Sequence, residues 1–420
     1  MTTRNLKSIS LLILLAMLIT TLPAWADGKK DKDYITISGV VKDQRNKRKL
    51  EYVNISVPGT SIGTVTNSDG GFSIKIADSI GARTIEISHL GYRSQKLSIG
   101  TTDMEDLDVF LVPNANTLPE VLVRAIDARG LVLEAVKKID VNNSKTPNML
   151  TGFYRETVRK RRNYINVTEA IINVYKSPYT EGINRDRVQV SKGRQLVSPK
   201  LSDTLIVKLQ GGPNYAIYLD VVKNHEILFD EQGMRDYKFT MGEPVMLDQR
   251  SHLVVNFEPQ LVQPYPLFYG KLYIDEETRA FTQAEFSYNM KDRSKVTHAI
   301  LKRKPFNLRF KPEMISYLVT YKQENGVTYL NYMRNEIQFK CDWKRKLFST
   351  NYTVVNEMVV TDKKLQNVSS IPGKEAFNFK HILSDKVSNF YDEDFWEGYN
   401  IIAPTESLES AVNKLRKQNK

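Results

Sequence analysis

Apolar and polar side chains alternate between Val53 and Tyr92 with a period of two, which is typical of β-strands that bury one face. Two groups of turn-forming residues interrupt the alternation, Pro58-Gly59 and Asn67-Ser68-Asp69-Gly70-Gly71. Glycine tolerates the positive φ of a tight turn, so the second group favours a hairpin. The pattern predicts a small β-sandwich with core positions Val53, Ile55, Val57, Phe72, Ile74, Ile76, Ile85 and Ile87.

From Met149 to Val360 the alternation returns in longer runs rich in aromatic residues, and it predicts a large antiparallel sheet, curved or closed to a half-barrel. Asn325-Gly326 is a strong hairpin signal within it. The expected strands are 153–158, 165–175, 203–207, 238–241, 253–258, 271–274, 280–289, 314–322, 327–340 and 347–360. One strand face should carry Ile315, Tyr317, Val319 and Tyr321.

Helical spacing appears in the segment between these two regions. Val132, Val136 and Ile139 recur on one helix face after Asp127, a residue type that caps helix starts, and Asn142-Asn143 ends the run. The spacing predicts one connecting helix.

A second helix is expected at the C-terminus, where Pro404-Thr405-Glu406-Ser407 precedes an apolar face of Leu408, Ala411, Val412 and Leu415. Such a face normally packs on the protein's own sheet. The alternative is contact with a membrane or a partner protein, since basic residues flank the face.

The first 26 residues have the three parts of a secretory signal peptide. Arg4 and Lys7 make the start basic, residues 9–22 are largely apolar, and Ala24-Trp25-Ala26 fits a cleavage site. A transmembrane anchor would need about 20 apolar residues and no cleavage site. We expect cleavage after Ala26 and a mature chain in the periplasm, outside the cell, or associated with the outer membrane.

These patterns divide the chain into six parts: 1–26, a signal peptide; 27–33, a charged linker; 34–113, the β-sandwich; 114–148, a polar break and the connecting helix; 149–400, a β-rich domain; and 401–420, a C-terminal helix. The single cysteine, Cys341, excludes an intrachain disulfide and provides no thiol for acylation near the cleavage site.

Four segments, 37–43, 50–55, 63–72 and 88–92, resemble in order and spacing the carboxypeptidase-like regulatory domain of Bacteroidota cell-envelope proteins. The resemblance covers residues 34–113 and implies a transthyretin-like sandwich of seven strands, an accessory module without catalytic residues. Asn67 stands where the family often has the first aspartate of its Thr-Asp-x-Asp-Gly turn. This departure argues against a cation site at Asp69.

Segments 133–139, 151–157, 169–170 and 174–179 resemble the region that follows this domain in uncharacterised Bacteroidota envelope proteins. The hairpin at 270–275 is similar to hairpins of lipoprotein carriers, whose half-barrel holds acyl chains. Analogy of fold therefore leaves carriage of a lipid or another hydrophobic ligand as an alternative function.

The chain is basic, with a formal charge of +12 that becomes +10 once Arg4 and Lys7 are removed. Its basic clusters are 155–162, 302–304, 344–346 and 414–420. No aromatic ladder interleaves them, so nucleic acid is not an expected partner. Solvated faces are favoured over a footprint for an anionic envelope surface.

Candidate catalytic motifs lack the context they need. Gly59-Thr60-Ser61-Ile62-Gly63 spells a nucleophile elbow, but strands and not a helix follow it. The five histidines, His89, His225, His252, His298 and His381, do not form a zinc motif. His225-Glu226 with Asp220 and Asp230 is the densest polar cluster, and we expect these side chains to be solvated.

We therefore expect no catalytic residues, no cofactor and no metal site. The expected function is that of a non-catalytic, exported envelope protein that serves interaction, assembly or ligand binding, with an envelope protein, a glycan or a lipid as partner and peripheral membrane contact as an option. Besides the lipid carrier, a hydrolase built on His225 and Glu226 is the remaining alternative.

Overall fold

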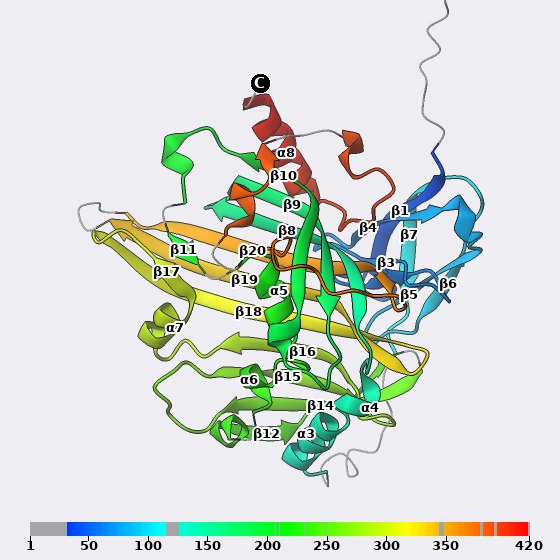
Figure 1. Cartoon of the computed structure of the whole chain (residues 1–420), viewed down its shortest axis with the longest axis horizontal. Helices are drawn as coiled ribbons and strands as arrows, with labels where there is room; N and C mark the ends of the chain where they lie inside the picture. Colours follow the sequence, from blue (N-terminus) through cyan, green and yellow to red (C-terminus); the bar gives the residue numbers. More distant parts are fainter. Residues whose placement is uncertain are drawn as a thin grey trace, which may run out of the picture.

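The computed structural model describes residues 32–114, 126–205, 207–209, 211–230, 232–247, 249–343, 348–378, 381–389 and 393–418. The expected signal peptide, most of the charged linker and most of the polar break after the sandwich lie outside the described residues. Within them the chain is mainly β (Figure 1).

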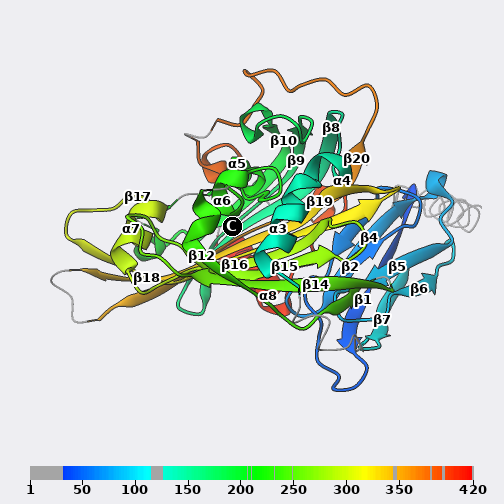
Figure 2. The same ribbon diagram turned by 90° about the horizontal axis from the view of Figure 1, so that it is seen from below.

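Seven strands form a sandwich at one end of the molecule (Figures 1 and 2). One sheet has the order β4-β1-β7 and the other the order β3-β2-β5-β6. Their bounds are β1 Tyr34–Asp43, β2 Asn54–Ser56, β3 Gly63–Val65, β4 Gly71–Ala77, β5 Thr84–Ser88, β6 Gln95–Ser98 and β7 Met104–Leu111, with a 3-10 turn η1 at Asp78–Ile80. All eight predicted core residues are at most 2% exposed, so the expected sandwich is confirmed.

The expected hairpin at the Asn67–Gly71 turn is wrong in one respect. β3 and β4 belong to different sheets, so the turn carries the chain from one layer of the sandwich to the other. Gly70 takes a φ of 71°, and the Asn67 side-chain carbonyl accepts from the backbone of Asp69 and of Gly71, both at 2.9 Å. The alternation of apolar residues cannot distinguish a hairpin within one sheet from a connection between two sheets, because the strands bury one face in both arrangements.

The large sheet has twelve strands in the order β12-β14-β15-β16-β18-β19-β20-β8-β9-β10-β21, with β13 paired to β14. It is antiparallel except where β21 lies parallel to β10. The bounds are β8 Asn148–Lys160, β9 Asn163–Lys176, β10 Arg187–Val197, β12 Tyr237–Met241, β13 Val245–Leu247, β14 Arg250–Pro259, β15 Phe268–Asp275, β16 Phe281–Tyr288, β18 Leu308–Glu324, β19 Val327–Trp343, β20 Thr350–Lys364 and β21 Ser388–Asn389. The described strands leave it open, with β12 and β21 at its edges.

Nine of the ten predicted strands of this region are confirmed, including the β18–β19 hairpin at Asn325-Gly326, where both residues have positive φ. The strand expected at 203–207 is wrong. That stretch follows the 3-10 turn η3 (Leu201–Asp203), and only β11 (Lys208–Leu209) pairs afterwards, with β17 (Leu301–Arg303). Strand β10 is not among the predicted strands, because its half-buried polar side chains hide the alternation.

The connecting helix is confirmed as α3 (Ala128–Lys137), where the Asp127 side chain accepts from the backbone of Arg129 at 3.1 Å, and α4 (Ile139–Asn142) continues it. The other described helices are α5 Pro213–Tyr218, α6 His225–Leu228, α7 Arg293–Ile300 and α8 Glu406–Gln418, and further 3-10 turns are η2 Ile183–Arg185, η4 Gly233–Asp236, η5 Leu383–Asp385 and η6 Glu393–Trp396. No described helix has both the length and the apolar character needed to cross a membrane.

One face of the large sheet carries the main hydrophobic core, and we call it the inner face. Ile315 and Val319 are fully buried on it, Tyr317 and Tyr321 are nearly so, and side chains of α3, α5, α6 and α7 pack against the same cluster. The aligned face predicted for β18 is therefore ordinary core. It is filled by protein side chains at the place where a half-barrel would hold an acyl chain.

The opposite, outer face carries the sandwich and the C-terminal segment. Phe153, Val359 and Tyr332 of the sheet pack against Val65 of the sandwich and Trp396 of the C-terminal segment. The apolar residues Leu408 and Leu415 of α8 pack on Val167 and Leu196, which confirms that this helix docks on its own sheet.

Candidate functional site

A ladder of alternating charge crosses the outer face of the sheet. Strand register places its members directly opposite one another on successive strands, in the order Lys271, Glu285, Leu318, Arg334, Glu357, Arg155, Glu169 and Arg194, and the uncharged Leu318 separates Glu285 from Arg334. Opposite charges on neighbouring strands attract, and like charges would repel. The sequence hides this pattern, because its members come from eight strands and are spread from residue 155 to residue 357.

One half of this charge ladder is buried under the sandwich and the C-terminal segment. The Arg155 guanidinium lies 2.8 Å from Glu169 and 3.4 Å from Glu357, and its third contact is a 2.7 Å hydrogen bond to the backbone carbonyl of Ile402. Arg194 contacts the second Glu169 oxygen at 2.9 Å. Burial alone would raise the pKa of Glu169, but the charges of Arg155 and Arg194 outweigh it and lower the pKa, so the carboxylate is ionised.

The other half of the charge ladder lines a groove of about 1560 Å³ between the sandwich and the sheet. Lys271, Glu285 and Arg334 lie in its floor, together with polar and aromatic side chains of β14, β15, β16 and β18. These floor residues include Asn256, Glu258, Tyr269, Tyr273, Gln283, Ser287 and Ser316. The volume exceeds the roughly 300–1,000 Å³ of small-molecule pockets, so the groove suits an extended ligand.

The sandwich supplies the other wall of the groove, from its connecting segments. Arg48, Glu51 and Tyr52 come from the segment before β2, and His89 and Tyr92 from the loop after β5. Tyr52 stacks on Tyr332 of the sheet with ring centroids 5.4 Å apart. Burial, with the charge of Arg48, lowers the pKa of His89 to about 4, so this imidazole is neutral near pH 7.

Both signs of charge are present in the groove. Basic side chains lining it are Arg48, Lys49, Arg159, Lys271, Lys291 and Arg334, and acidic ones are Glu51, Glu258, Glu285 and Glu336. Arg334 lies 2.8 Å from Glu336. Although burial would raise the pKa of Glu336, hydrogen bonding from Gln338 and the charge of Arg334 lower it. A ligand with only one sign of charge, or with none, would leave part of this lining unmatched.

Asn67, the residue that departs from the family turn, fastens the C-terminal segment to the sandwich. Its amide nitrogen donates to the carbonyls of Ala403 and Pro404, both at 3.0 Å, while its oxygen holds the turn. The Asp69 carboxylate accepts from the backbone nitrogen of Glu406 at 3.1 Å, at the start of α8. The Asp69 carboxylate of this turn is therefore bound to the first turn of helix α8.

Replacing Asn67 with aspartate should loosen this attachment. A carboxylate can still accept from the turn but cannot donate, and it would face two carbonyl oxygens. We expect Asn67→Asp to lower the free energy of unfolding by about 1–3 kcal/mol. Urea unfolding monitored by tryptophan fluorescence measures this, since Trp396 lies in the attached segment. Asn46→Asp, on an exposed turn, is the control, and an equal effect of both variants would contradict this role for Asn67.

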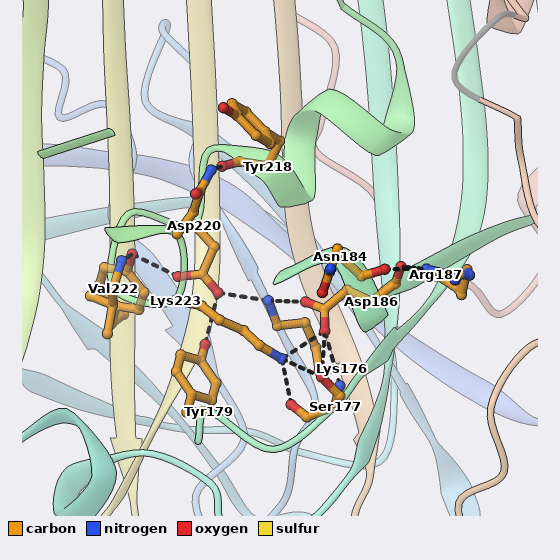
Figure 3. A network of polar contacts seen from close by, with 12 residues as sticks. Lys176, Ser177, Tyr179, Asn184, Asp186, Arg187, Tyr218, Asp220, Val222 and Lys223 are labelled. Atoms are coloured by element: carbon orange, nitrogen blue, oxygen red, sulfur yellow. Dashed lines mark hydrogen bonds and ion pairs between the residues drawn. The ribbon is translucent and has the colours of Figure 1, made fainter. Parts of the chain in front are cut away.

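A second charged network is buried on the inner side of the sheet, near the end of β9 (Figure 3). Lys176 lies 2.7 Å from Asp186 and 2.7 Å from Asp220, and Lys223 lies 2.6 Å from Asp186. Asp220 also accepts from the hydroxyls of Tyr179 at 2.8 Å and of Tyr321 at 3.0 Å. Two cations and two anions balance, which is what permits their burial.

The structure separates the residues of the predicted polar cluster. Asp220 is fully buried in the network just described, which corrects the expectation that it is solvated. His225 and Glu226 are exposed, and the His225 ring contacts the carbonyl of Val222 at 2.9 Å. Asp230 accepts from the backbone of Gly233. The four side chains do not converge on a common point, so the geometry adds nothing to the hydrolase alternative.

Ser61 is likewise a structural residue. Its hydroxyl donates to Asp362 of β20 at 2.7 Å, and β3 follows it directly where an elbow would need a helix. The histidines remain apart, and within the part of the chain that the structure describes no group of three metal-ligating side chains is found.

Arg155 corrects the reading of the basic clusters as solvated faces. It is 2% exposed, whereas Arg161 and Arg162 of the same cluster are exposed. The sequence contains one signal for the burial of Arg155. It lies two positions after Phe153 in β8, so both side chains point to the same face of the sheet, the face that the sandwich covers.

Comparison with known proteins identifies the N-terminal part. The model of the CarboxypepD_reg-like domain matches residues 37–123. Among curated proteins, the TonB-dependent receptor P3 of Formosa agariphila is 28% identical over 144 residues, and the TonB-dependent receptor SusC of Bacteroides thetaiotaomicron is 29% identical over 151. Each match covers 34% of this chain but only 13% and 14% of the respective receptor, so the chain spans a small fraction of these relatives.

Two solved structures were matched over much of the chain at low similarity. A DUF1329 family protein from Desulfovibrio piger has 10% identity and a TM-score of 0.24, covering 58% of this chain and 95% of its own. MucB in complex with MucA has 11% identity and a TM-score of 0.17, covering 58% and 100%. Scores of this size carry no argument about fold or function. What the match to the family model does establish, in agreement with the seven-strand sandwich, is that residues 37–123 are a CarboxypepD_reg-like domain.

Proposed function

We propose that this protein is a non-catalytic, exported envelope component that binds an extended polypeptide segment of a partner in the groove between its CarboxypepD_reg-like domain and its large sheet. The observation that carries the proposal is the charge ladder, one half of which is covered by the chain's own C-terminal segment while the other half is open in the groove.

The covered half shows what this surface accepts. Arg155 donates to the carbonyl of Ile402, Thr64 donates to the carbonyl of Ile401 at 3.0 Å, and Trp396 packs edge-on against Phe153. Backbone carbonyls and an aromatic side chain of the C-terminal segment thus satisfy a buried arginine of the sheet, a threonine of the sandwich and an apolar sheet residue. The open half offers the same chemistry, with Arg334 and Lys271 as donors and Tyr269 and Tyr273 as apolar platforms.

Lipid carriage is less well supported by this surface. Acyl chains need an apolar lining, and the groove carries ten charged side chains. The proposed export and envelope location rest on the sequence pattern of residues 1–26 and on the domain type. Cell fractionation tests this location. Recovery of the chain from cytosol with residues 1–26 attached would contradict both.

Selection of random dodecapeptides displayed on phage against the purified protein tests the proposal. We expect enriched peptides with mixed charge and aromatic residues, whose affinity by fluorescence polarisation falls about tenfold in Lys271→Glu or in Glu285→Lys, because each reversal leaves one mismatched charge pair. The double variant K271E/E285K restores the alternation in reverse and should recover part of the affinity.

Lys311→Glu, at the far end of the sheet, is the matched control and should leave peptide affinity unchanged. Failure to enrich any peptide, or equal affinity in the groove variants, would refute peptide binding. Binding of maltohexaose or oligogalacturonate in place of peptides would refute it in favour of a glycan site.

A further inference from the structure

The four large apolar side chains that are most exposed all lie in connections at one end of the large sheet. Leu201 is 93% exposed, Val262 90%, Phe306 90% and Phe348 80%, whereas the other large apolar residues with notable exposure reach at most 59%. Leu201 follows β10, Val262 joins β14 to β15, Phe306 precedes β18 and Phe348 precedes β20. Scattered exposed apolar residues are ordinary, but a group at one end is not.

Strand register shows that the connections carrying Phe306, Phe348 and Leu201 are neighbours. Leu308 pairs with Trp343 and Cys341 pairs with Thr350, so Phe306 and Phe348 each lie two residues from the ends of strands in the consecutive set β18, β19 and β20. Lys160, at the end of β8 beside β20, donates to the carbonyl of Ser202 next to Leu201. This end lies opposite the sandwich (Figures 1 and 2).

Basic side chains surround three of these apolar tips, Leu201, Phe306 and Phe348. Among described residues, segments 160–163, 198–209, 301–311 and 348–351 contain a single acid, Asp203, which pairs with Lys160 at 3.1 Å, and Asp342 at the adjacent end of β19 pairs with Lys311 at 2.7 Å. Their basic residues are Lys160, Arg161, Arg162, Lys200, Lys208, Lys302, Arg303, Lys304, Arg309 and Lys311. A Lys directly precedes Leu201, and Lys304 stands two residues before Phe306.

From this combination we propose that the end of the sheet carrying Leu201, Val262, Phe306 and Phe348 is a membrane-docking surface that binds a bilayer with anionic headgroups. Protruding apolar side chains enter the interface between headgroups and acyl chains, and the surrounding Lys and Arg are attracted to lipid phosphates. Each basic residue near such a surface strengthens binding about fivefold. The groove and the sandwich then face away from the bilayer, where a partner has access to them.

Vesicle sedimentation tests the proposal with the protein purified as the cell processes it and its N-terminus determined by mass spectrometry. We expect binding to vesicles of phosphatidylcholine with phosphatidylglycerol or lipid A, weak binding to phosphatidylcholine alone, and loss of affinity at high salt. The double variant F306S/F348S should bind at least tenfold more weakly, because each buried Phe contributes about tenfold or more. K302E/R303E should also weaken binding, by about tenfold or more.

Val141→Ser is the matched control, because Val141 is 59% exposed on α4, away from the docking surface. It should bind as the parent does, and circular dichroism should show all variants folded, since none of the changed side chains is buried. Equal binding to neutral and anionic vesicles, or unchanged binding in F306S/F348S, would overturn the proposal. Displacement by millimolar inorganic phosphate would overturn it in favour of a phosphate site, and retention on an acidic polypeptide without vesicle binding would do so in favour of a protein partner.

Discussion

Replacing Lys176 with methionine should lower the free energy of unfolding by about 3–5 kcal/mol, because it breaks a buried ion-pair network. Methionine matches the length of the side chain but removes the cation that contacts both Asp186 and Asp220. Lys223 then remains as the only lysine of the network, and it contacts Asp186 alone among the two carboxylates. A buried carboxylate without its cation is far more costly than a lost surface pair. Urea unfolding followed by far-ultraviolet circular dichroism measures the change.

Lys311→Met is the control for this prediction. Lys311 lies 2.7 Å from Asp342, as close as the buried pairs, but its side chain is 51% exposed, so solvent screening reduces the expected loss to about 0–1 kcal/mol. If the two lysine variants lose similar amounts, the Lys176 network is not a stabilising unit.

The pH dependence of stability gives a second readout of the same network. Burial would raise the pKa of Asp220, but the charge of Lys176 and the hydrogen bonds it accepts outweigh burial and lower the pKa below its ordinary value. The stabilisation is therefore complete above the unfolded pKa, about 4, and is lost as the pH falls through the lower folded pKa. The acid limb of the parent should accordingly be steeper than that of Asp220→Asn, which has no carboxylate to protonate there.

Replacing Arg155 with methionine should also cost about 3–5 kcal/mol, and it should release the C-terminal segment from the sheet. The change leaves Glu169 and Glu357 buried without their shared cation, and it removes the donor to the carbonyl of Ile402. Hydrogen exchange measured by mass spectrometry should show faster exchange over residues 396–408, beyond the increase seen elsewhere. Loss of order in that segment would in turn uncover the closed half of the charge ladder.

Arg185→Met serves as the control here, since the Arg185 side chain is 68% exposed and pairs with Glu181 within one turn. It should leave both stability and exchange nearly unchanged. A destabilised Arg155→Met protein in which segment 396–408 exchanges no faster than the remainder would show that Arg155 stabilises the sheet without holding the segment.

Much of the architecture could be predicted from local pattern. The eight alternating residues of the sandwich, the Asn325-Gly326 hairpin and the Asp127 cap were readable because each depends on residues close together in the chain. Where two strands succeed each other across a turn, as at Asn67–Gly71, pattern predicts the strands but not whether they pair. Strand β10 was not predicted, because it lies near the edge of the sheet and its half-buried polar side chains do not alternate regularly with apolar ones.

The candidate site could not be predicted in the same way. Residues Lys271, Arg334 and Arg155 look like ordinary solvated charges in the sequence, and their roles come from strand order, which joins β15, β19 and β8 through intervening strands. The candidate catalytic cluster of His225, Glu226 and Asp220 does not form a site. His225 and Glu226 are exposed on α6, whereas Asp220 is buried against Lys176.

Periodicity, turn residues and the family motif were thus enough to predict most strands, the two main helices and the domain type. The reason is that burial of alternate side chains is a local requirement, which the order of residues within a short segment can meet. The placement of the sandwich on the outer face, the half-covered charge ladder and the apolar tips at one end arose only from the tertiary fold. Each depends on residues more than a hundred positions apart, and no local pattern encodes which strands a sheet will bring side by side.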